Sequence, residues 1–504
     1  MRTSSMMFIL LFVFLAFPAM GQNCNGSIEY IGDIRVLNLW GSWNEMGYAH
    51  GYLLGPDIST VFHDYFLEMV GGSSTFENAR LFYLAHFDTP SDLSQYAQGI
   101  LTGIADTVSI YSDRLGRDLD YIDICVVTSI PDIVSLKGGP SLLCSSVSAW
   151  GAATQAAPSL SGSPAISRNL DYYVDTGGTI LDNSILITYD PANGQEWISV
   201  SFPGFAGSLS GMNQSGVSAC LNMGNNQGTV QYTSPFVPIC MALALGLSEE
   251  DFNGSGTCDP EDMTDALTQW NRGNSYDIHV VGKRSLSPQD SSSVVVEVSN
   301  RDGCAFRYAE DEAAISPCRM ILTNHHRVLI PPVTCYRYTD LMDSLTTNPD
   351  VTLDRLWNFM GAVGWPATPG SGGTIQTMVF MPEQLEMGLA FATSTTPSYQ
   401  QDPEWIGWND IFPNHVPQGL DPVIEPTGFS VSPNPSLGTV SILIPTPSAE
   451  VGIYDISGRR MDVHLEQVNE ESLQADISNL PAGIYSVVCI SEGSNQTLEI
   501  VVIR

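Results

Sequence analysis

From about residue 144 to residue 298 the chain consists mainly of short apolar and β-branched runs, which Gly, Asn, Ser and Pro separate. Such runs are typical of strands. The expected strands are 145–150, 185–189, 197–202, 217–222, 278–281 and 294–298. Apolar residues at helical spacing occur at 44–67, with an expected break at Gly55-Pro56, and at 76–87, 95–111, 260–272 and 338–344. A helical front followed by many strands predicts a layered α+β domain.

The C-terminal end has a different texture and is predicted to be a separate module. Four prolines between residues 413 and 426 indicate a linker there. Residues 427–504 then hold strand-like runs at 440–444, 451–454, 484–490 and 498–503, with turn residues between them. This length and spacing predict a small all-β sandwich.

The N-terminal end carries the features of a signal peptide over residues 1–21. Arg2 supplies a positive charge, residues 8–17 are apolar, and the small residues Ala19 and Gly21 precede Gln22. Ten apolar residues are well short of the ~20 that a membrane-spanning helix needs. No later run is long and apolar enough either, so we expect an exported protein without a transmembrane segment.

Charge and motifs exclude several classes of function. Acidic residues outnumber basic ones 54 to 19, for a formal charge of −35, which disfavours nucleic acid as a partner. The sequence lacks the G-x-S-x-G motif of serine hydrolases, the H-E-x-x-H motif of zinc proteases, the P-loop motif and the EF-hand loop. His325 and His326 are adjacent, but neighbours on a chain point in different directions, so the pair is a poor chelator. We expect no metal and no cofactor.

The chain has ten cysteines, and export would permit disulfides. Cys304 and Cys318 flank an expected hairpin and are the best local pair. Cys144 has a different context, because it begins the first strand-like run, Cys144–Trp150, after a Gly-Gly-Pro loop. The tetrapeptide Arg168–Asp171 follows about two dozen residues later. Taken alone, such a cysteine is more often buried or bridged than catalytic, and such a tetrapeptide is more often a turn.

The order of these motifs is more specific than each motif alone. Residues 36–55, Cys144–Trp150 and Ser167–Tyr173 resemble the acyltransferase and hydrolase family of fungal isopenicillin acyltransferase. The pattern is also similar to acid ceramidases and N-acylethanolamine amidases, and more loosely to choloylglycine hydrolases. The segments 211–222 and 322–325 resemble further landmarks of the family. The resemblance covers about residues 30–412.

The resemblance implies an N-terminal-nucleophile fold, an αββα four-layer sandwich, and a self-processing cysteine enzyme. The implied cut lies between Leu143 and Cys144, and separates residues 22–143 from a larger part, 144–412, that begins with the nucleophile. The freed α-amino group would act as the base, and Cys144 would take the acyl group of an N-acyl amide as a thioester. Water or an acceptor amine would complete the reaction.

The same resemblance implies roles for four further residues. Arg168 would favour the thiolate, and Asp171 would orient the new α-ammonium group. Asn222 would donate to the oxyanion, with Asn274 as a weaker candidate. The alternatives are a structural ion pair for Arg168 and Asp171 and an ordinary strand end for Asn222.

One departure from the family pattern concerns the residue before the nucleophile. Many members have glycine there, whereas this chain has Leu143. A bulky residue at this position would slow the acyl shift. The competing hypothesis is therefore a cell-surface binding or structural protein that keeps the fold without catalysis.

The C-terminal module resembles the type A sorting domain of the type IX secretion system. The resemblance rests on residues 429–435, 451–459 and 480–485, in that order. It implies a bacterium like the Bacteroidetes, the secretion machinery as a partner, and a product that is released or attached to the cell surface.

Overall fold

The computed structural model describes residues 24–412 and 430–502 with short gaps. The gaps are 135–142, 226–230, 232–234, 284–291, 433–437, 445–448, 456–458, 470–471 and 492–493. The predicted signal peptide and linker lie outside the described residues. The chain divides into two compact units, Met1–Pro413 and Asn414–Arg504.

Two β-sheets form the centre of the first unit. The larger sheet has nine strands within the described residues, in the order β1-β2-β7-β8-β9-β10-β11-β12-β13. Its neighbouring strands are antiparallel except for the parallel pair β2 and β7. The strands are β1 Gly26–Ile31, β2 Ile34–Gly41, β7 Ile185–Pro191, β8 Trp197–Ser201, β9 Ser210–Asn213, β10 Ser218–Met223, β11 Ser275–Val281, β12 Ser293–Ser299 and β13 Gly303–Arg307.

The second sheet carries the Cys144 and Arg168–Asp171 motifs on adjacent strands. It has six strands in the described part of the chain, all antiparallel, in the order β14-β5-β6-β15-β16-β17. The strands are β5 Leu143–Ala149, β6 Ala165–Val174, β14 Arg319–Leu322, β15 Ser371–Met381, β16 Glu386–Phe391 and β17 Glu404–Gly407. A small hairpin, β3 Tyr111–Ser112 with β4 Arg117–Asp118, lies outside both sheets.

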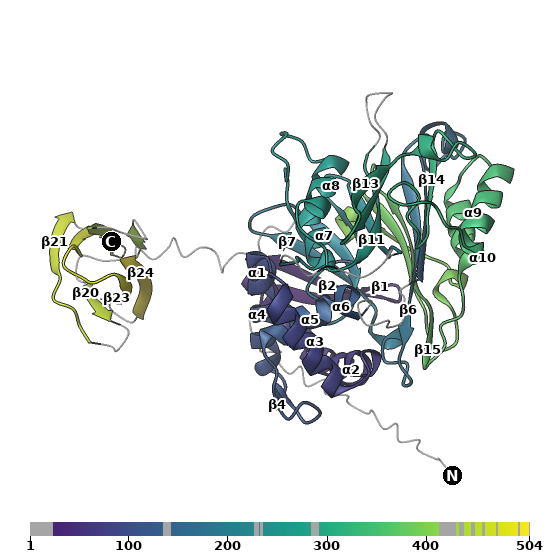
Figure 1. The fold of residues 1–504 in the computed structure, drawn as a ribbon. Coiled ribbons are helices and arrows are strands. Elements are labelled where there is room, and N and C mark those ends of the chain that lie inside the picture. Colours follow the sequence, from purple (N-terminus) through teal and green to yellow (C-terminus); the bar gives the residue numbers. More distant parts are fainter. Residues whose placement is uncertain are drawn as a thin grey trace, which may run out of the picture. The chain divides into compact units, whose positions relative to one another are not determined.

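Helices cover the outer face of each sheet (Figure 1). On the nine-stranded sheet they share one apolar core with the strands. These helices are α1 Trp43–Thr60, a π-helix Val61–Phe66, α2 Leu67–Met69, α3 Ser73–His86, α4 Ser91–Ala105, α5 Tyr121–Thr128, α6 Ile130–Val134, α7 Ile239–Ser248 and α8 Pro260–Thr268. On the six-stranded sheet, α9 Tyr336–Thr347 and α10 Leu353–Val363 share a second core with the strands. The short helix α11 Trp408–Ile411 follows β17.

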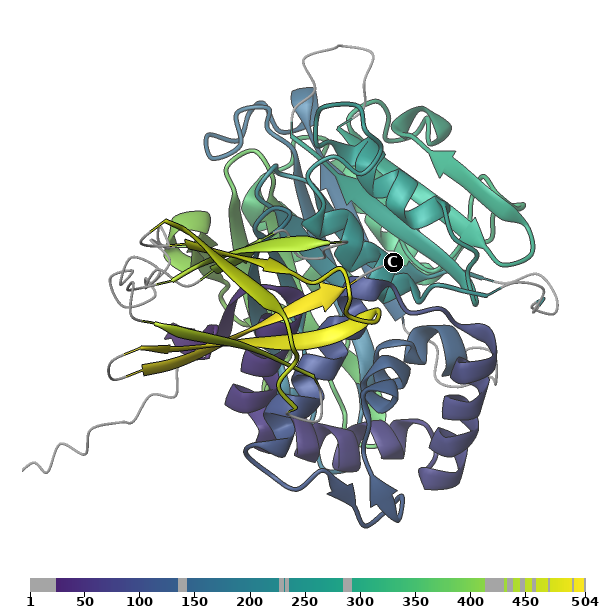
Figure 2. The same cartoon turned by 90° about the vertical axis from the view of Figure 1, so that its left-hand side faces the viewer.

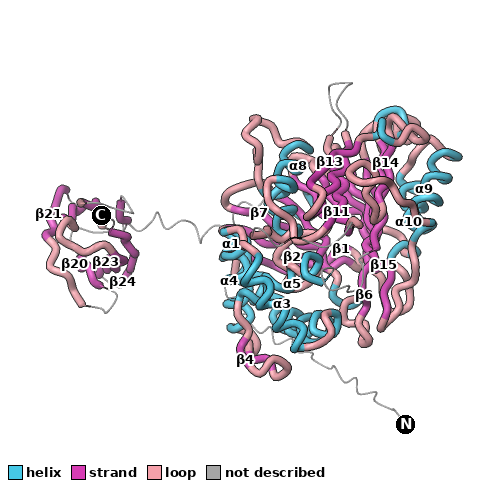
Figure 3. Tube along the Cα trace, viewed as in Figure 1, coloured by secondary structure: helices cyan, strands magenta, loops and turns pink. Residues whose placement is uncertain are grey.

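A third apolar core lies between the two sheets and includes Val36, Ile166 and Val200. Along β2, Leu37 and Leu39 belong instead to the helix-facing core, as the two-residue period of a strand requires. Figure 3 shows the resulting order, with the magenta strands between two sets of cyan helices. Figure 2 shows the first unit turned by 90°, with the helices of the N-terminal part toward the viewer. The predicted α+β class and its αββα layering are confirmed.

The glycines of the segment 36–55 have a structural reason. A Cβ atom at Gly47 would lie 2.1 Å from the carbonyl oxygen of Tyr96, and one at Gly51 would lie 2.0 Å from that of Ile100. Only glycine permits α1 and α4 to approach this closely. The break expected at Gly55-Pro56 is a kink, because α1 runs through Pro56 with non-helical angles at Leu54 only.

The predicted Cys304–Cys318 disulfide is wrong, since both thiols are free. The expected hairpin between them does not form. Cys304 lies on β13, which pairs with β12 in the nine-stranded sheet, whereas Cys318 precedes β14, which pairs with β5 in the six-stranded sheet. Two segments that look like one hairpin in the sequence therefore enter different layers.

The second unit is a small β-sandwich. One sheet has the order β18-β19-β22-β21 and the other β20-β23-β24. Val440 and Ala475 from the first sheet share a core with Ile453 and Val487 from the second. The strands are β18 Ser430–Ser432, β19 Thr439–Leu443, β20 Glu450–Asp455, β21 His464–Asn469, β22 Ser472–Asp476, β23 Gly483–Ser491 and β24 Ser494–Val502.

Candidate active site

Cys144 lies near the start of β5, between the edge strand β14 and β6 of the six-stranded sheet. It pairs with Leu170 on β6, and Arg168 pairs with Ser146 two residues along. Directly opposed residues of antiparallel strands share a face, so Cys144 and Arg168 are diagonal neighbours on one face. The Cys144 side chain is 1% exposed. The register of β5 and β6 therefore brings the two sequence motifs into contact.

Arg168 places a buried positive charge beside the thiol. Its Nη2 lies 3.5 Å from the Cys144 Sγ and also donates to the carbonyl oxygen of Leu221, while Nη1 donates to Ser210 Oγ. Burial raises the pKa of the Cys144 thiol above its ordinary value, and Arg168 opposes this rise. In the intact chain the thiol is therefore protonated at neutral pH.

Asp171 lies on the opposite face of β6, across from Leu143. Its Oδ1 accepts a hydrogen bond of 2.6 Å from Thr374 Oγ1 on β15. Its Oδ2 is 3.8 Å from Nη1 of Arg337. Burial raises the pKa of Asp171 to about 6, although Thr374 and Arg337 lower it. This carboxyl group is thus poised to change charge just below neutral pH.

The peptide backbone of Cys144 is held by two side chains from distant parts of the chain. The backbone nitrogen donates to Asn324 Oδ1 at 2.9 Å. Arg337 donates through Nη1 to the Cys144 carbonyl oxygen and through Nη2 to Asn324 Oδ1 at 2.8 Å. The sequence analysis included Asn324 only as part of the segment 322–325, which resembles the family. No sequence motif indicated Arg337, which is 193 residues from Cys144.

The two predicted oxyanion residues lie in different places. Asn222, on β10, is fully buried and donates from Nδ2 to the carbonyl oxygen of Thr323 at 2.8 Å, so it belongs to the same polar group as Asn324. One N–H of that amide remains for another acceptor. Asn274 instead donates to the carbonyl oxygen of Pro131 at 3.3 Å. The structure therefore joins Asn222 to the group around Cys144, whereas this bond of Asn274, the residue before β11, links it to α6.

A second thiol lies close to this group. Cys335 caps the N-terminus of α9, and its Sγ is 3.8 Å from Thr323 Oγ1. Burial alone would raise the pKa of Cys335, but hydrogen bonds from His325 and the Tyr338 backbone, and the charge of Arg337, lower it to about 6. Cys335 is half-buried, whereas Cys144 is buried.

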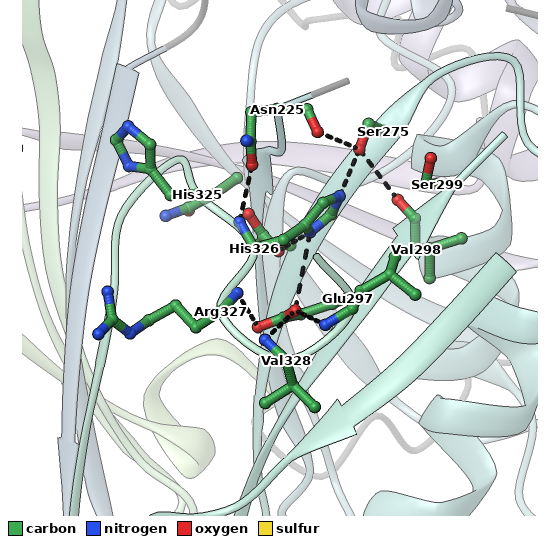
Figure 4. Close-up of polar contacts among 12 residues, drawn as sticks. Asn225, Ser275, Glu297, Val298, Ser299, His325, His326, Arg327 and Val328 are labelled. Carbon is green, nitrogen blue, oxygen red and sulfur yellow. Dashed lines mark hydrogen bonds and ion pairs between the residues drawn. The ribbon is translucent and has the colours of Figure 1, made fainter. Parts of the chain in front are cut away.

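In the described part of the chain, one group of side chains has donor atoms close enough for a metal ion. These side chains are Asp277, Glu297 and His326, whose donor atoms lie within 4.8 Å of one another. The Glu297 carboxylate already accepts three backbone N–H groups, from residues 327–329, and pairs with Arg307 at 3.2 Å. Internal donors and a positive charge therefore occupy a carboxylate that a metal would need as a ligand, and the group fits an ion-pair cluster better. Figure 4 shows Glu297 and His326 with their polar contacts.

Fold and site together define a two-sheet αββα protein with a buried cysteine beside an arginine. Residues 430–504 match the family model of the secretion system C-terminal sorting domain, which confirms the predicted sorting domain. An uncharacterized protein from Archaeoglobus fulgidus is 24% identical over 227 residues, which span 41% of this chain and 36% of that protein. None of the helices among the described residues has the length and apolar composition needed to cross a membrane.

Several solved structures are also similar. An N-acylethanolamine-hydrolyzing acid amidase ortholog from Caenorhabditis elegans is 15% identical, with a TM-score of 0.36 over 52% of this chain and 98% of that chain. A mutant conjugated bile acid hydrolase from Clostridium perfringens is 10% identical, with a TM-score of 0.32 over 52% and 92%. A penicillin V acylase from Agrobacterium tumefaciens is 12% identical, with a TM-score of 0.31 over 53% and 88%.

Proposed function

We propose that the chain is the precursor of a secreted, self-processing cysteine amidohydrolase or acyltransferase that acts on an N-acyl amide. The observation that carries this proposal is the arrangement around one peptide bond. The Cys144 Sγ lies 3.5 Å from Arg168, and the Cys144 backbone nitrogen is held by Asn324. The family resemblance of the segments 144–150 and 167–173 supports the same reading.

Self-processing would begin with attack of the Cys144 Sγ on the carbonyl carbon of Leu143. The thiol proton passes to the Cys144 nitrogen as the C–N bond breaks, and the Leu143 acyl group moves onto sulfur as a thioester. Water then hydrolyses the thioester. The products are a carboxylate on Leu143 and a free thiol and α-amine on Cys144. Asn324 holds the nitrogen of the scissile bond, and Arg337 holds the carbonyl oxygen of the next peptide, so Cys144 is fixed on both sides of its α-carbon.

Turnover would use the same sulfur and the new amine. The α-amino group, with an ordinary pKa of about 7.7–8.0, accepts the thiol proton, and the thiolate attacks the acyl carbon of the substrate. The amine of the substrate leaves with a proton, and the acyl group stays on Cys144 as a thioester. Water or an acceptor amine then takes the acyl group. Asn222 is the candidate donor to the oxyanion, through its remaining N–H.

Asp171 would hold the ammonium form of the new terminus. Its carboxyl group is buried and already linked to Arg337 at 3.8 Å, so a second cation nearby lowers the pKa of Asp171 and keeps it ionised during turnover. Asp171 therefore acts on the orientation of the base rather than on the substrate.

The sorting domain directs the enzyme out of the cell. Residues 430–504 match a secretion sorting domain, and the type IX machinery is the expected partner. With the signal peptide expected at 1–21, the precursor would cross the inner membrane first and the outer membrane second. The mature enzyme would be released or attached to the cell surface.

Denaturing electrophoresis with N-terminal sequencing tests the proposal. The parent protein should give two fragments, the larger one beginning at Cys144. Cys144→Ala should stay intact and should not hydrolyse N-acyl amides, whereas Cys144→Ser should process slowly, because a hydroxyl can undergo the same shift. A parent chain that stays intact and inactive would favour the binding or structural alternative.

A further inference from the structure

The loop that follows β14 connects the two sheets at the nucleophile. Asn324, the second residue of this loop, accepts from the Cys144 nitrogen on β5 and donates to the carbonyl oxygen of Met223 on β10 at 2.8 Å. It is therefore bonded to the six-stranded and the nine-stranded sheet at once. Its position depends on how firmly the residues after it are attached.

His326 attaches the loop to the nine-stranded sheet two residues further on. Its Nδ1 is 2.6 Å from Asp277 Oδ1, its Nε2 is 2.5 Å from Ser275 Oγ, and its backbone nitrogen donates to Asn225 Oδ1 at 2.9 Å. Figure 4 shows the ring between Ser275 and Glu297, while His325 points away from the cluster. The His326 side chain is 0% exposed.

Glu297 holds the next three residues of the loop. Its Oε1 accepts from the backbone nitrogen of Arg327, and its Oε2 accepts from those of Val328 and Leu329, at 2.8 to 2.9 Å. The His326 Nδ1 lies 4.0 Å from the same carboxylate. Four consecutive backbone N–H groups of the loop, from residues 326–329, are thus bound by two side chains.

Protonation of His326 brings the charges of this cluster closer to balance. Three carboxylates, Asp277, Glu297 and Glu312, face three cations, Arg307, Arg327 and His326. Asp302, in the turn after β12, adds a further negative charge near the ring. Burial raises the pKa of Asp277, and a neutral His326 would remove the cation that opposes this rise, which destabilises the region around the carboxyl group.

Titration of the ring follows from these neighbours. Burial opposes the protonation of His326, but the hydrogen bond and charge of Asp277, with the charges of Glu297 and Asp302, raise its pKa above the ordinary value. A raised pKa means that the protonated ring stabilises the fold fully below about pH 6.5. This stabilisation is lost as the pH rises through the raised value.

We propose that His326 is a positioning residue for the reaction at Cys144, because its ion pair with Asp277 fixes the loop that carries Asn324. The inference rests on the proposed function for its kinetic part only. His326 does not touch the reacting atoms and acts through Asn324. An ion-pair cluster of this kind needs no metal ion.

The test compares three single variants with the parent. His326→Gln keeps hydrogen-bonding groups but is neutral at every pH, and Asp277→Asn removes the partner charge. His50→Gln is the matched control, because His50 is also fully buried and bonds to Tyr96 and Gly204, away from this loop. We expect all three to lower the melting temperature. Only the first two should slow self-processing and kcat, by about 10- to 100-fold, with little change in KM.

Hydrogen exchange of the peptide 319–330 gives a measurement that is independent of activity. The N–H groups of residues 326–329 should lose protection in His326→Gln, and in the parent as the pH rises above neutral, but not in His50→Gln. The double variant His326→Gln with Asp277→Asn, which has no uncompensated charge, should recover part of the rate and lose the pH dependence.

Three results would overturn the proposal. They are parental rates and loop protection in His326→Gln, equal loss of rate in His50→Gln, and a stoichiometric divalent metal bound to the cluster in the purified protein. If single variants fail to fold, the pH dependence of loop protection in the parent still decides. A parent protein that cleaves neither itself nor an N-acyl amide would overturn the proposed function instead. The exchange data would then test only whether His326 and Asp277 hold the loop after β14 in place.

Discussion

The Nη2 atom of Arg168 lies 3.5 Å from the Sγ atom of Cys144, with both side chains almost fully buried. The same guanidinium group donates to Ser210 and to the carbonyl oxygen of Leu221, which lie on or beside the nine-stranded sheet. Arg168, on β6, thus links the six-stranded sheet that carries Cys144 to the nine-stranded sheet. The orientation of its guanidinium group is fixed by Ser210 and Leu221, which have no proposed part in the chemistry.

Replacing Arg168 by glutamine should slow both self-processing and turnover by on the order of 10²-fold, because the thiolate loses its nearest cation. The acidic limb of the pH profile, on which activity rises as the thiol ionises, should move to higher pH. Single-turnover assays over a range of pH measure both effects.

Arg272→Gln is the control for the loss of a buried arginine. Arg272 is almost fully buried and donates to the carbonyl oxygens of Leu267, Ala266 and Val237, all outside the group around Cys144. We expect it to lower stability while the pH profile stays parental. A profile that is unchanged in Arg168→Gln would show that the charge has no part in activating the thiol.

The sequence pointed to the contact between Cys144 and Arg168 better than to the rest of the candidate site. Cys144, Arg168 and Asp171 fall on two strands that are adjacent in sequence and in the sheet, so short motifs together with the family resemblance were enough to bring them together. Asn324 and Arg337 reach the site because β14 pairs with the edge of β5 that faces away from β6. A local sequence pattern does not predict such a long-range pairing. The Cys304–Cys318 prediction failed for the same reason.

The carboxyl group of Asp171 should give the protein a measurable pH dependence of stability. Burial raises its pKa to about 6 from an ordinary value of about 3.9. The folded state then binds the proton more tightly, so stability is greatest below about pH 4 and falls as the pH rises through 6. At low pH, protonated Asp171 should contribute about 3 kcal/mol to the free energy of unfolding, and this contribution should be lost above about pH 6.

Thermal unfolding of uncleaved Cys144→Ala, with and without Asp171→Asn, measures this contribution. The difference between the two melting curves should change between pH 4 and 6 and stay constant above pH 7. A constant difference over the whole range would mean that Asp171 has an ordinary pKa in the fold.

Cys335 should be the most reactive accessible thiol of the precursor at mildly acidic pH. Its pKa is lowered to about 6, against the effect of burial, by His325, the Tyr338 backbone and Arg337. Iodoacetamide labelling followed by mass spectrometry should therefore give a midpoint near pH 6 for this residue.

Cys304, which is exposed on β13, serves as the reference thiol in the same sample. His325→Gln should move the labelling midpoint of Cys335 upward and leave the labelling of Cys304 unchanged. Equal midpoints for Cys335 in the parent and in His325→Gln would exclude His325 as the group that activates this thiol.

Removal of the C-terminal unit should separate secretion from catalysis. The group around Cys144 is drawn from residues 143–374, and all of it belongs to the first compact unit. The sandwich after residue 430 has its own apolar core, so the first unit does not need it for packing. A chain that ends at Asn414 should keep the self-processing and amidase rates of the parent in vitro, and in the native host it should accumulate in the periplasm. A truncated protein that melts like the parent but has lost turnover would instead assign the sandwich to the active enzyme.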